Sequence, residues 1–188
     1  MNFLTITHIQ ALKVFLWQYK IFKKNMASKK YTEKEKRGYL DFNHARTPEQ
    51  IELMKKIAED GICPFCPEYL LKYHPKPILK EGKWWYVSEN MSPYEGTRVH
   101  LMFFYKKHTN LTSEIDPEAA KELFELIGWA EKEYEMEGGS FFVRFGKSEY
   151  TGGSVDHYHV QMLVGDAKGT DAEHNKLKVK LGYKKLLK

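Results

Sequence analysis

The chain has 188 residues, 42% hydrophobic and 14% aromatic, which is enough for one sizeable core in a single domain with extensions. Its 30 Lys and Arg exceed its 25 Asp and Glu, and the net charge of +5 suits anionic small molecules but gives no strong nucleic-acid signal, because much of it lies in terminal lysine runs. The close spacing of the two cysteines suits a metal better than a framework disulfide and favours a reducing, cytoplasmic compartment. No stretch is long and apolar enough to span a membrane.

The N-terminal segment has the pattern of a basic amphipathic helix. Within residues 8–24, apolar side chains recur at helical spacing between lysines. Such a helix can lie on an anionic membrane, dock on a partner or pack on the domain, and the segment can also precede a true start at Met26. We expect residues 1–46 to form an N-terminal extension with a charged linker, and residues 47–188 to form the main domain with a basic C-terminal segment.

Two helices and two strands are predicted between residues 47 and 140. Thr47-Pro48-Glu49-Gln50 combines an N-cap, a proline at the first helical position and a capping Gln, so it opens a helix that ends at Asp60-Gly61. Strands are expected at 84–89 and 97–105, where aromatic and β-branched residues gather. The longest helix begins at Asp116-Pro117 and is expected to stop at Gly138-Gly139.

Two further strands, residues 140–146 and 154–164, are predicted to form a hairpin-like pair joined by a glycine-rich turn. Lysines alternate with Leu177, Val179 and Leu181, a pattern expected of an edge strand. Strands around one long helix predict an α+β fold with an antiparallel sheet.

The last of these strands carries a polar row. Alternation places His157, His159 and Gln161 on one face, while Tyr158 and its apolar neighbours take the other. Just before them, Gly152-Gly153-Ser154 lets the backbone approach an anion, and Ser154 can donate to it. This arrangement is typical of a phosphate site, although His-x-His also occurs by chance on solvated strands.

A second cluster supports a functional interpretation. Cys63-Pro64-Phe65-Cys66 offers two thiolates, and His108 and the His-x-His pair offer imidazoles, a set that can close a tetrahedral Cys2His2 zinc site. The alternative for His108 is an ordinary surface histidine in a lysine-rich loop. We expect His44, His74 and His174 to lie on the surface and His100 to be structural or on the substrate side.

At these residues the chain resembles the histidine triad superfamily, in particular its Gln-containing branch typified by galactose-1-phosphate uridylyltransferase and diadenosine tetraphosphate phosphorylase. The resemblance covers about residues 62–165: the Cys-x-x-Cys, Asn90-Met91-Ser92-Pro93, the strand and loop ending at His108, and the stretch from Gly152 to Gln161. Two residues depart from the family pattern, because Arg144 stands where Asn is usual and Gly153 where triad hydrolases commonly have Gln.

The resemblance implies a fold and a chemistry. The fold would be an antiparallel sheet with one long helix and flanking helices, often as a homodimer. His159 would attack the α-phosphorus of a nucleoside polyphosphate or nucleotide sugar and form a nucleotidyl-histidine intermediate. Gln161 and Ser154 would contact the reacting phosphate, Asn90 and Gly153 would help to bind the substrate, and Cys63, Cys66, His108 and His157 would hold a structural zinc.

Three alternatives remain open, one for the role of Asn90 and two for the function of the whole chain. Asn90 can equally be a polar turn residue. The chain can be a non-catalytic nucleotide- or protein-binding module that keeps a zinc-organised fold, which the Arg144 and Gly153 departures make possible. It can also be a glutaredoxin-like dithiol redox protein, although that motif should follow a buried strand, whereas here it follows a polar helix end.

Overall fold

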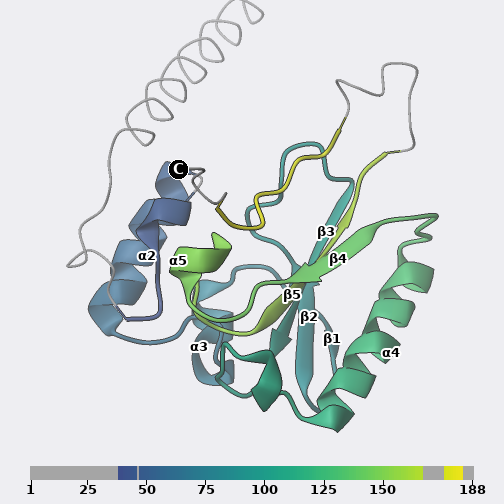
Figure 1. Cartoon of the computed structure of the whole chain (residues 1–188), viewed down its shortest axis with the longest axis horizontal. Coiled ribbons are helices and arrows are strands. Elements are labelled where there is room, and N and C mark those ends of the chain that lie inside the picture. The colour runs from purple at the N-terminus through teal and green to yellow at the C-terminus, as the bar shows by residue number, and fades with distance from the viewer. Residues whose placement is uncertain (1–37, 46, 167–175, 184–188) are drawn as a thin grey trace, which may run out of the picture. The chain divides into compact units, whose positions relative to one another are not determined.

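The computed structural model describes residues 38–45, 47–166 and 176–183, and it contains a five-stranded antiparallel sheet. The strand order is β1-β2-β3-β5-β4, so β1 and β4 form the edges. The predicted α+β class with an antiparallel sheet and one long helix is confirmed (Figure 1). The elements are η1 (Phe42–His44), α2 (Pro48–Asp60), α3 (Pro67–Tyr73), β1 (Ile78–Glu81), β2 (Trp85–Glu89), β3 (Val99–Tyr105), η2 (Thr112–Glu114), α4 (Pro117–Glu133), β4 (Ser140–Val143), α5 (Ser148–Thr151) and β5 (His159–Val164).

The helix starts follow the predicted capping residues. The Thr47 side chain accepts the Gln50 N–H at 3.1 Å, and Gly61 ends α2 with a φ of 66°. At α4, the Asp116 carboxylate accepts the Glu118 N–H at 2.8 Å. This helix ends at Glu133, before the expected Gly138-Gly139, because Tyr134 already leaves the helical conformation.

The two faces of the sheet have different functions. One face packs on α4 and forms the main core, in which the Trp85 Nε1–H donates to the Ala119 carbonyl at 2.7 Å. Figure 1 shows α4 on one side of the sheet and α2, α3 and α5 on the other. The second face carries the polar residues of the site. The buried residues of the main core are Trp85, Val87, Leu101, Phe103, Tyr105, Ala119, Leu126, Ile127, Ala130, Tyr158, Val160 and Met162.

Strand β5 is shorter than predicted, because it begins at His159 and not at Ser154. The preceding residues bond elsewhere: Leu40 forms a bridge with Val155, and the Asp41 N–H donates to the Ser154 carbonyl at 3.0 Å. The Tyr158 N–H donates to the Thr109 carbonyl at 2.6 Å. The backbone of residues 154–156 therefore bonds to the 39–41 segment, and only at Tyr158, whose carbonyl accepts the Tyr105 N–H of β3 at 3.2 Å, does the pairing with the sheet begin.

Other boundaries also differ from the prediction. β4 ends at Val143 rather than at residue 146, and the short helix α5 lies in the connection between β4 and β5. Residues 176–183 form no strand, so the predicted C-terminal edge strand is wrong for this part of the chain. The expected amphipathic helix at residues 8–24 and His174 lie outside the described residues, and the domain boundary after residue 46 stays a prediction. No helix in the described ranges is long and apolar enough to cross a bilayer.

Candidate active site and metal centre

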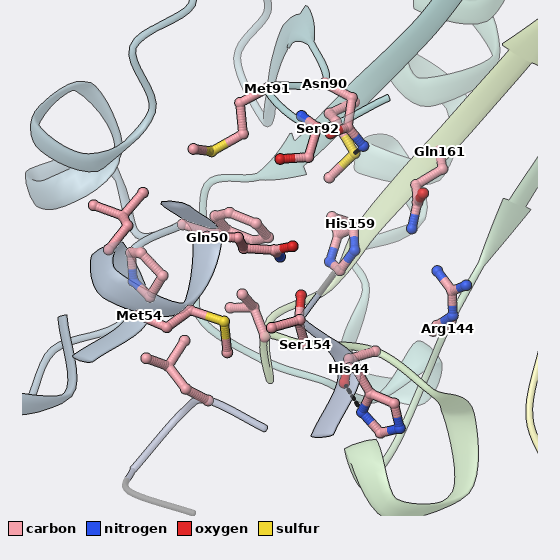
Figure 2. Close-up of a pocket in the computed structure, with 18 of the residues that line it drawn as sticks. His44, Gln50, Met54, Asn90, Met91, Ser92, Arg144, Ser154, His159 and Gln161 are labelled. Carbon is pink, nitrogen blue, oxygen red and sulfur yellow. Dashed lines mark hydrogen bonds between the residues drawn. The ribbon is translucent and has the colours of Figure 1, made fainter. Parts of the chain in front are cut away.

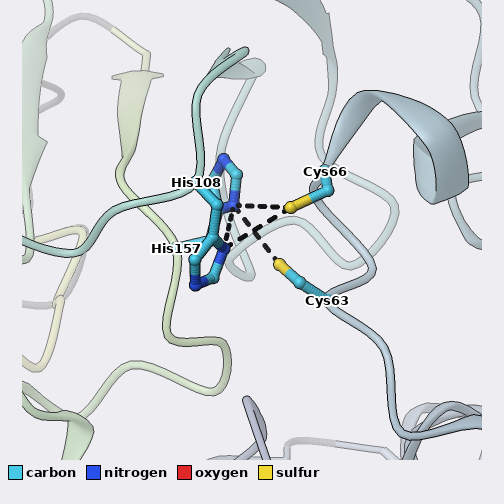
Figure 3. A group of neighbouring side chains, drawn as sticks. All are labelled: Cys63, Cys66, His108 and His157. Atoms are coloured by element: carbon cyan, nitrogen blue, oxygen red, sulfur yellow. Dashed lines mark hydrogen bonds between the residues drawn. The ribbon is translucent and has the colours of Figure 1, made fainter.

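The structure brings the four predicted metal ligands together. Ligand atoms of Cys63, Cys66, His108 and His157 all lie within 4.8 Å of one another. Figure 3 shows the two thiols and two imidazoles pointing toward a common centre. They come from three distant segments: the turn between α2 and α3, the loop after β3, and the residues before β5. The expected position of the Cys-x-x-Cys motif in a turn after a helix is confirmed.

A hydrogen bond to the backbone fixes the orientation of the His157 ring. The Nε2–H of His157 donates to the Tyr105 carbonyl at 2.7 Å, which leaves the lone pair on Nδ1 facing the cluster. Burial lowers the pKa of His157 to about 4, so the ring is neutral at neutral pH. A neutral imidazole held by its other nitrogen is the usual form of a metal-binding histidine.

The donor distances fit a tetrahedral metal ion. A zinc ion bound at ordinary lengths would separate two nitrogens by roughly 3.3 Å and a nitrogen from a sulfur by roughly 3.6 Å. The two Nδ1 atoms of His108 and His157 are 3.3 Å apart, and the sulfur-to-nitrogen distances are 3.3, 3.4 and 3.8 Å. Burial raises the pKa of Cys63 to about 12 and also raises the pKa of Cys66. Soft donors of this kind are compatible with a zinc site, where the cation would hold both sulfurs as thiolates.

Beside the metal cluster, the second sheet face opens into a cavity of about 360 Å³. Figure 2 shows the His159 ring projecting into it, with Gln161 and Arg144 next to the ring. Apolar side chains from α2 and the Asn90–Tyr94 turn form the opposite wall. The residues that line it are Leu40, Asn43, His44, Ala45, Gln50, Leu53, Met54, Ile57, Pro64, Phe65, Tyr73, His74, Asn90, Met91, Ser92, Tyr94, Met102, Phe104, Arg144, Gly152, Gly153, Ser154, Val155, His159, Gln161, Lys178 and Lys180.

His159 has one defined tautomer in this cavity. Its Nδ1–H donates to the carbonyl of His157 at 2.6 Å, so the lone pair is on Nε2. Burial lowers the pKa of His159 to about 4, and the positive charge of Arg144 acts in the same direction. The ring is therefore neutral at neutral pH, with its lone pair available on Nε2. Phe65, from the Cys-x-x-Cys turn, packs edge-on against it with ring centroids 5.2 Å apart.

Gln161 is oriented by a buried neighbour on β3. The Tyr94 N–H donates to His100 Nδ1 at 3.2 Å, which places the His100 proton on Nε2, where Gln161 Oε1 accepts it at 3.1 Å. Asn90 Nδ2 also lies 3.0 Å from His100 Nε2, and in this tautomer its N–H donates to Met102 Sδ at 3.3 Å. The amide nitrogen of Gln161 is then directed away from His100 as a donor. Asn90 also lies here, and its Oδ1 accepts the Ser92 N–H at 2.8 Å. That contact matches the turn interpretation of Asn90, and its role in substrate binding stays a prediction.

The glycine-rich turn borders the same cavity. Gly152 ends α5 with a φ of 70°, a backbone conformation that favours glycine. The Gly153 N–H donates to Thr151 Oγ1 at 3.2 Å, and its carbonyl accepts His44 Nδ1–H at 2.8 Å. Both backbone groups of Gly153 are therefore engaged within the protein. The hydroxyl of Ser154 points into the cavity (Figure 2).

The structure corrects the expectation for two histidines and adds two residues to the site. His74 is buried at 4% exposure and bonds Ser88 Oγ at 2.8 Å, so it is not a surface residue. His44 is only 12% exposed in its side chain and lines the cavity, contacting Asp41 and the Tyr183 hydroxyl. Arg144 lines the cavity, and His100, expected to be structural or on the substrate side, is buried and contacts Gln161. Alternation could have pointed to Arg144, since it directly follows β4, but the strand pairing was needed to place it.

Comparisons with known proteins give structural neighbours only. No family model matches the chain, and no curated protein matches it. Solved structures similar to it include a histidine triad nucleotide-binding protein from Candida albicans (17% identity, TM-score 0.49, covering 68% of this chain and 86% of that one). A Zn-bound histidine triad family protein from Mycobacterium smegmatis has 22% identity and a TM-score of 0.46, covering 63% and 81% of the two chains. A hypothetical protein from Leishmania major has 19% identity and a TM-score of 0.48, covering 66% and 83%. Because function resides in site residues and not in a fold, the side chains of the cavity decide what the chain can do.

Proposed function

We propose that the chain is a nucleotide-binding hydrolase or nucleotidyltransferase of the histidine triad type, acting at the α-phosphate of a nucleoside polyphosphate or nucleotide sugar. The observation that carries this proposal is the 2.6 Å bond from His159 Nδ1–H to the His157 carbonyl. It leaves a neutral Nε2 lone pair facing a cavity that is cationic at one end and apolar at the other. A nucleotide has the matching division between phosphate and base.

The reaction would proceed in two displacements. His159 Nε2 attacks the α-phosphorus, a P–N bond forms, and the P–O bond to the leaving phosphate or sugar phosphate breaks. No proton has to leave the attacking nitrogen, because Nε2 carries none, while Nδ1 keeps its proton on the His157 carbonyl. Water, or an anionic oxygen of phosphate or a sugar phosphate, then attacks the phosphorus, and the P–N bond breaks to release the nucleotide product and neutral His159. When water attacks, its proton passes to solvent.

Gln161 and Ser154 would contact the transferred phosphoryl group. The Gln161 amide, oriented by His100, supplies an N–H donor, and the Ser154 hydroxyl supplies an O–H donor. An amide cannot release a proton, so Gln161 is not a general acid. The proposal therefore favours leaving groups that depart as stable anions, such as a diphosphate or a sugar phosphate.

A structural zinc would be held by Cys63, Cys66, His108 and His157. Four protein ligands leave no open coordination position, so the ion would organise the site and not activate a substrate. Its effect on the chemistry would pass through His157, whose ring binds the metal and whose carbonyl holds His159. A cytoplasmic location and a homodimer remain expectations that belong to this proposal.

Mass spectrometry of the intact protein tests the proposal. The protein is incubated with a dinucleoside polyphosphate or a nucleotide sugar and quenched in base, because a phosphoramidate is labile in acid. We expect a mass gain of one nucleoside monophosphate on the native chain and none on His159→Ala, whose zinc content should be unchanged. Substrate turnover by His159→Ala at the native rate would exclude His159 as the nucleophile.

The two alternatives give different results in the same experiment. A non-catalytic binding module would retain nucleotide affinity without consuming substrate or forming an adduct. A dithiol redox protein requires thiols of lowered pKa, whereas burial raises the pKa of both Cys63 and Cys66. Their sulfurs also face imidazoles of the cluster, so the geometry gives no support to the redox alternative.

A further inference from the structure

Arg144 lies directly across the sheet from the proposed nucleophile. The register of β4 and β5 pairs Phe142 with Gln161 and Val143 with Val160, so the next residue of each strand places Arg144 opposite His159. Residues directly opposite on antiparallel strands share a face, with Cβ atoms about 4.5–5.5 Å apart. Figure 2 shows the guanidinium of Arg144 beside Gln161 and His159 at the same end of the cavity.

The Arg144 side chain is held in place by its neighbours. Its Nε–H donates to the Thr151 carbonyl at 3.0 Å, and Nη2 donates to the Tyr94 hydroxyl at 3.0 Å and to the Lys180 carbonyl at 2.6 Å. The guanidinium carbon lies 4.9 Å from the centre of the Phe142 ring. Among the described residues, none accepts from Nη1, whose two N–H groups therefore remain for a ligand.

No carboxylate among the described lining residues neutralises this charge. Arg144, Lys178 and Lys180 line the cavity, and the described part of its wall contains no Asp or Glu. A fixed, half-buried guanidinium attracts an anion more strongly than the same group in water. Because three of its bonds are already made, binding a phosphate would cost little further side-chain entropy.

The glycine at residue 153 makes room for this arrangement. A Cβ at Gly153 would lie 3.5 Å from Arg144 Cδ, an ordinary contact, and 3.3 Å from Thr151 Oγ1. An alanine would therefore meet the aliphatic part of Arg144, and a longer side chain would compete with it for space. The two residues that depart from the family pattern, Arg144 and Gly153, are in this way physically connected.

We infer that Arg144 is the principal phosphate-binding residue of the cavity and that it stabilises the charge on the phosphoryl oxygens while His159 attacks. The inference rests on the proposed function. It makes Arg144 the source of positive charge in a site that has Gln161 where the triad hydrolases have a third histidine. Arg144 moves no proton. It binds the anion through a planar pair of N–H donors that a lysine cannot reproduce.

Nucleotide binding tests this inference separately from turnover. The affinities of AMP, GMP, UMP and CMP, and of the corresponding nucleosides, are measured by calorimetry for the native chain, Arg144→Gln and Arg144→Lys. Since a hydrogen bond to a charged group contributes about 1.5–3 kcal/mol, Arg144→Gln should weaken the bound nucleotide about 10- to 150-fold. Nucleoside affinity should not change, and Arg144→Lys should recover only part of the loss.

Two control variants separate binding from charge and from folding. Arg98 is exposed and lies outside this cavity, so Arg98→Gln removes the same charge and should leave nucleotide affinity unchanged. Gly153→Gln should displace the Arg144 side chain and reproduce its loss, while Gly153→Ala should have a smaller effect. These variants keep the test valid if Arg144→Gln does not fold.

The outcomes distinguish this inference from the proposed function. Arg144-dependent nucleotide binding without a His159 adduct would support Arg144 and overturn the proposed catalysis. A His159 adduct with nucleotide affinity and adduct rate unchanged in both Arg144→Gln and Gly153→Gln would overturn the role of Arg144 and leave the catalysis standing. A native chain that binds no mononucleotide would overturn both.

Discussion

Removing one cysteine should show whether the Cys63, Cys66, His108 and His157 cluster stabilises the fold by binding a metal. Cys66→Ser is the sharper change, because Cys66 is only half-buried and its loss disturbs packing less than loss of the fully buried Cys63. The four donors connect three segments that are 42 to 94 residues apart in sequence. A bound ion therefore crosslinks the folded state, and its removal should lower both metal content and the free energy of unfolding.

The size of the effect follows from the binding equilibrium. At a free zinc concentration 100 times the Kd, a site present only in the folded state contributes about 2.7 kcal/mol. For a chain of this length, about 2–4 °C of Tm accompanies each kcal/mol, so saturating zinc should raise the Tm of the native chain by about 5–11 °C. Cys66→Ser should lose most of this increase, and its zinc content should fall below one ion per chain.

Thermal unfolding with and without zinc, together with elemental analysis, measures both quantities. Glu68→Gln is the matched control, because it changes an exposed residue near the same turn without removing a donor. It should retain the zinc content and the zinc-dependent Tm of the native chain. An equal response of Cys66→Ser and the native chain to zinc would refute the reasoning.

Three further changes test other parts of the structure. Trp85→Phe should lower the free energy of unfolding by about 1–3 kcal/mol in denaturant titrations, because the Ala119 carbonyl loses its buried donor; an unchanged midpoint would contradict the bond. Burial lowers the pKa of His74 in the folded state, so protonation of this residue favours the unfolded chain. The stability that depends on neutral His74 is therefore fully present above the unfolded pKa of about 6.5 and is lost as the pH falls below it. His74→Gln should therefore flatten the decline of stability below neutral pH, and parallel curves would exclude this origin. Gln161→His should increase hydrolysis relative to transfer, measured as the product ratio with and without phosphate, and an unchanged ratio would leave Gln161 without this role.

The helices and the metal cluster were the most predictable parts of the molecule. The capping residues Thr47 and Asp116 act locally, so their sequence neighbours were enough to place the starts of α2 and α4. The four metal ligands could be predicted because Cys2His2 is a restricted chemical set and the resemblance ordered its members. The separation of core and polar residues along β5 also follows from simple alternation, as Val160 and Met162 show.

The rest depended on pairing between distant segments. The prediction of a strand from Ser154 was wrong because the 39–41 segment takes the backbone bonds of residues 154–156, which no local pattern reveals. His74 was expected on the surface, yet it follows directly after α3 and packs edge-on against Phe104, with ring centroids 5.2 Å apart. Arg144 was noted only as a departure from a family pattern, since its position opposite His159 requires the register of β4 and β5.

Phe65 gives the metal centre and the cavity a shared wall. Phe65 stands between the two cysteines in sequence. Its ring contacts the rings of His157, His159 and Phe104 at centroid distances of 6.1, 5.2 and 4.8 Å. A ligand bound in the cavity and an ion bound in the cluster would therefore bias the conformation of the same turn. If the proposed zinc and nucleotide both bind, thermodynamic reciprocity requires that the factor by which zinc changes nucleotide affinity equals the factor by which nucleotide changes zinc affinity. The amount of zinc that the protein retains against competing chelators in the cell would in that case report how much nucleotide the protein has bound.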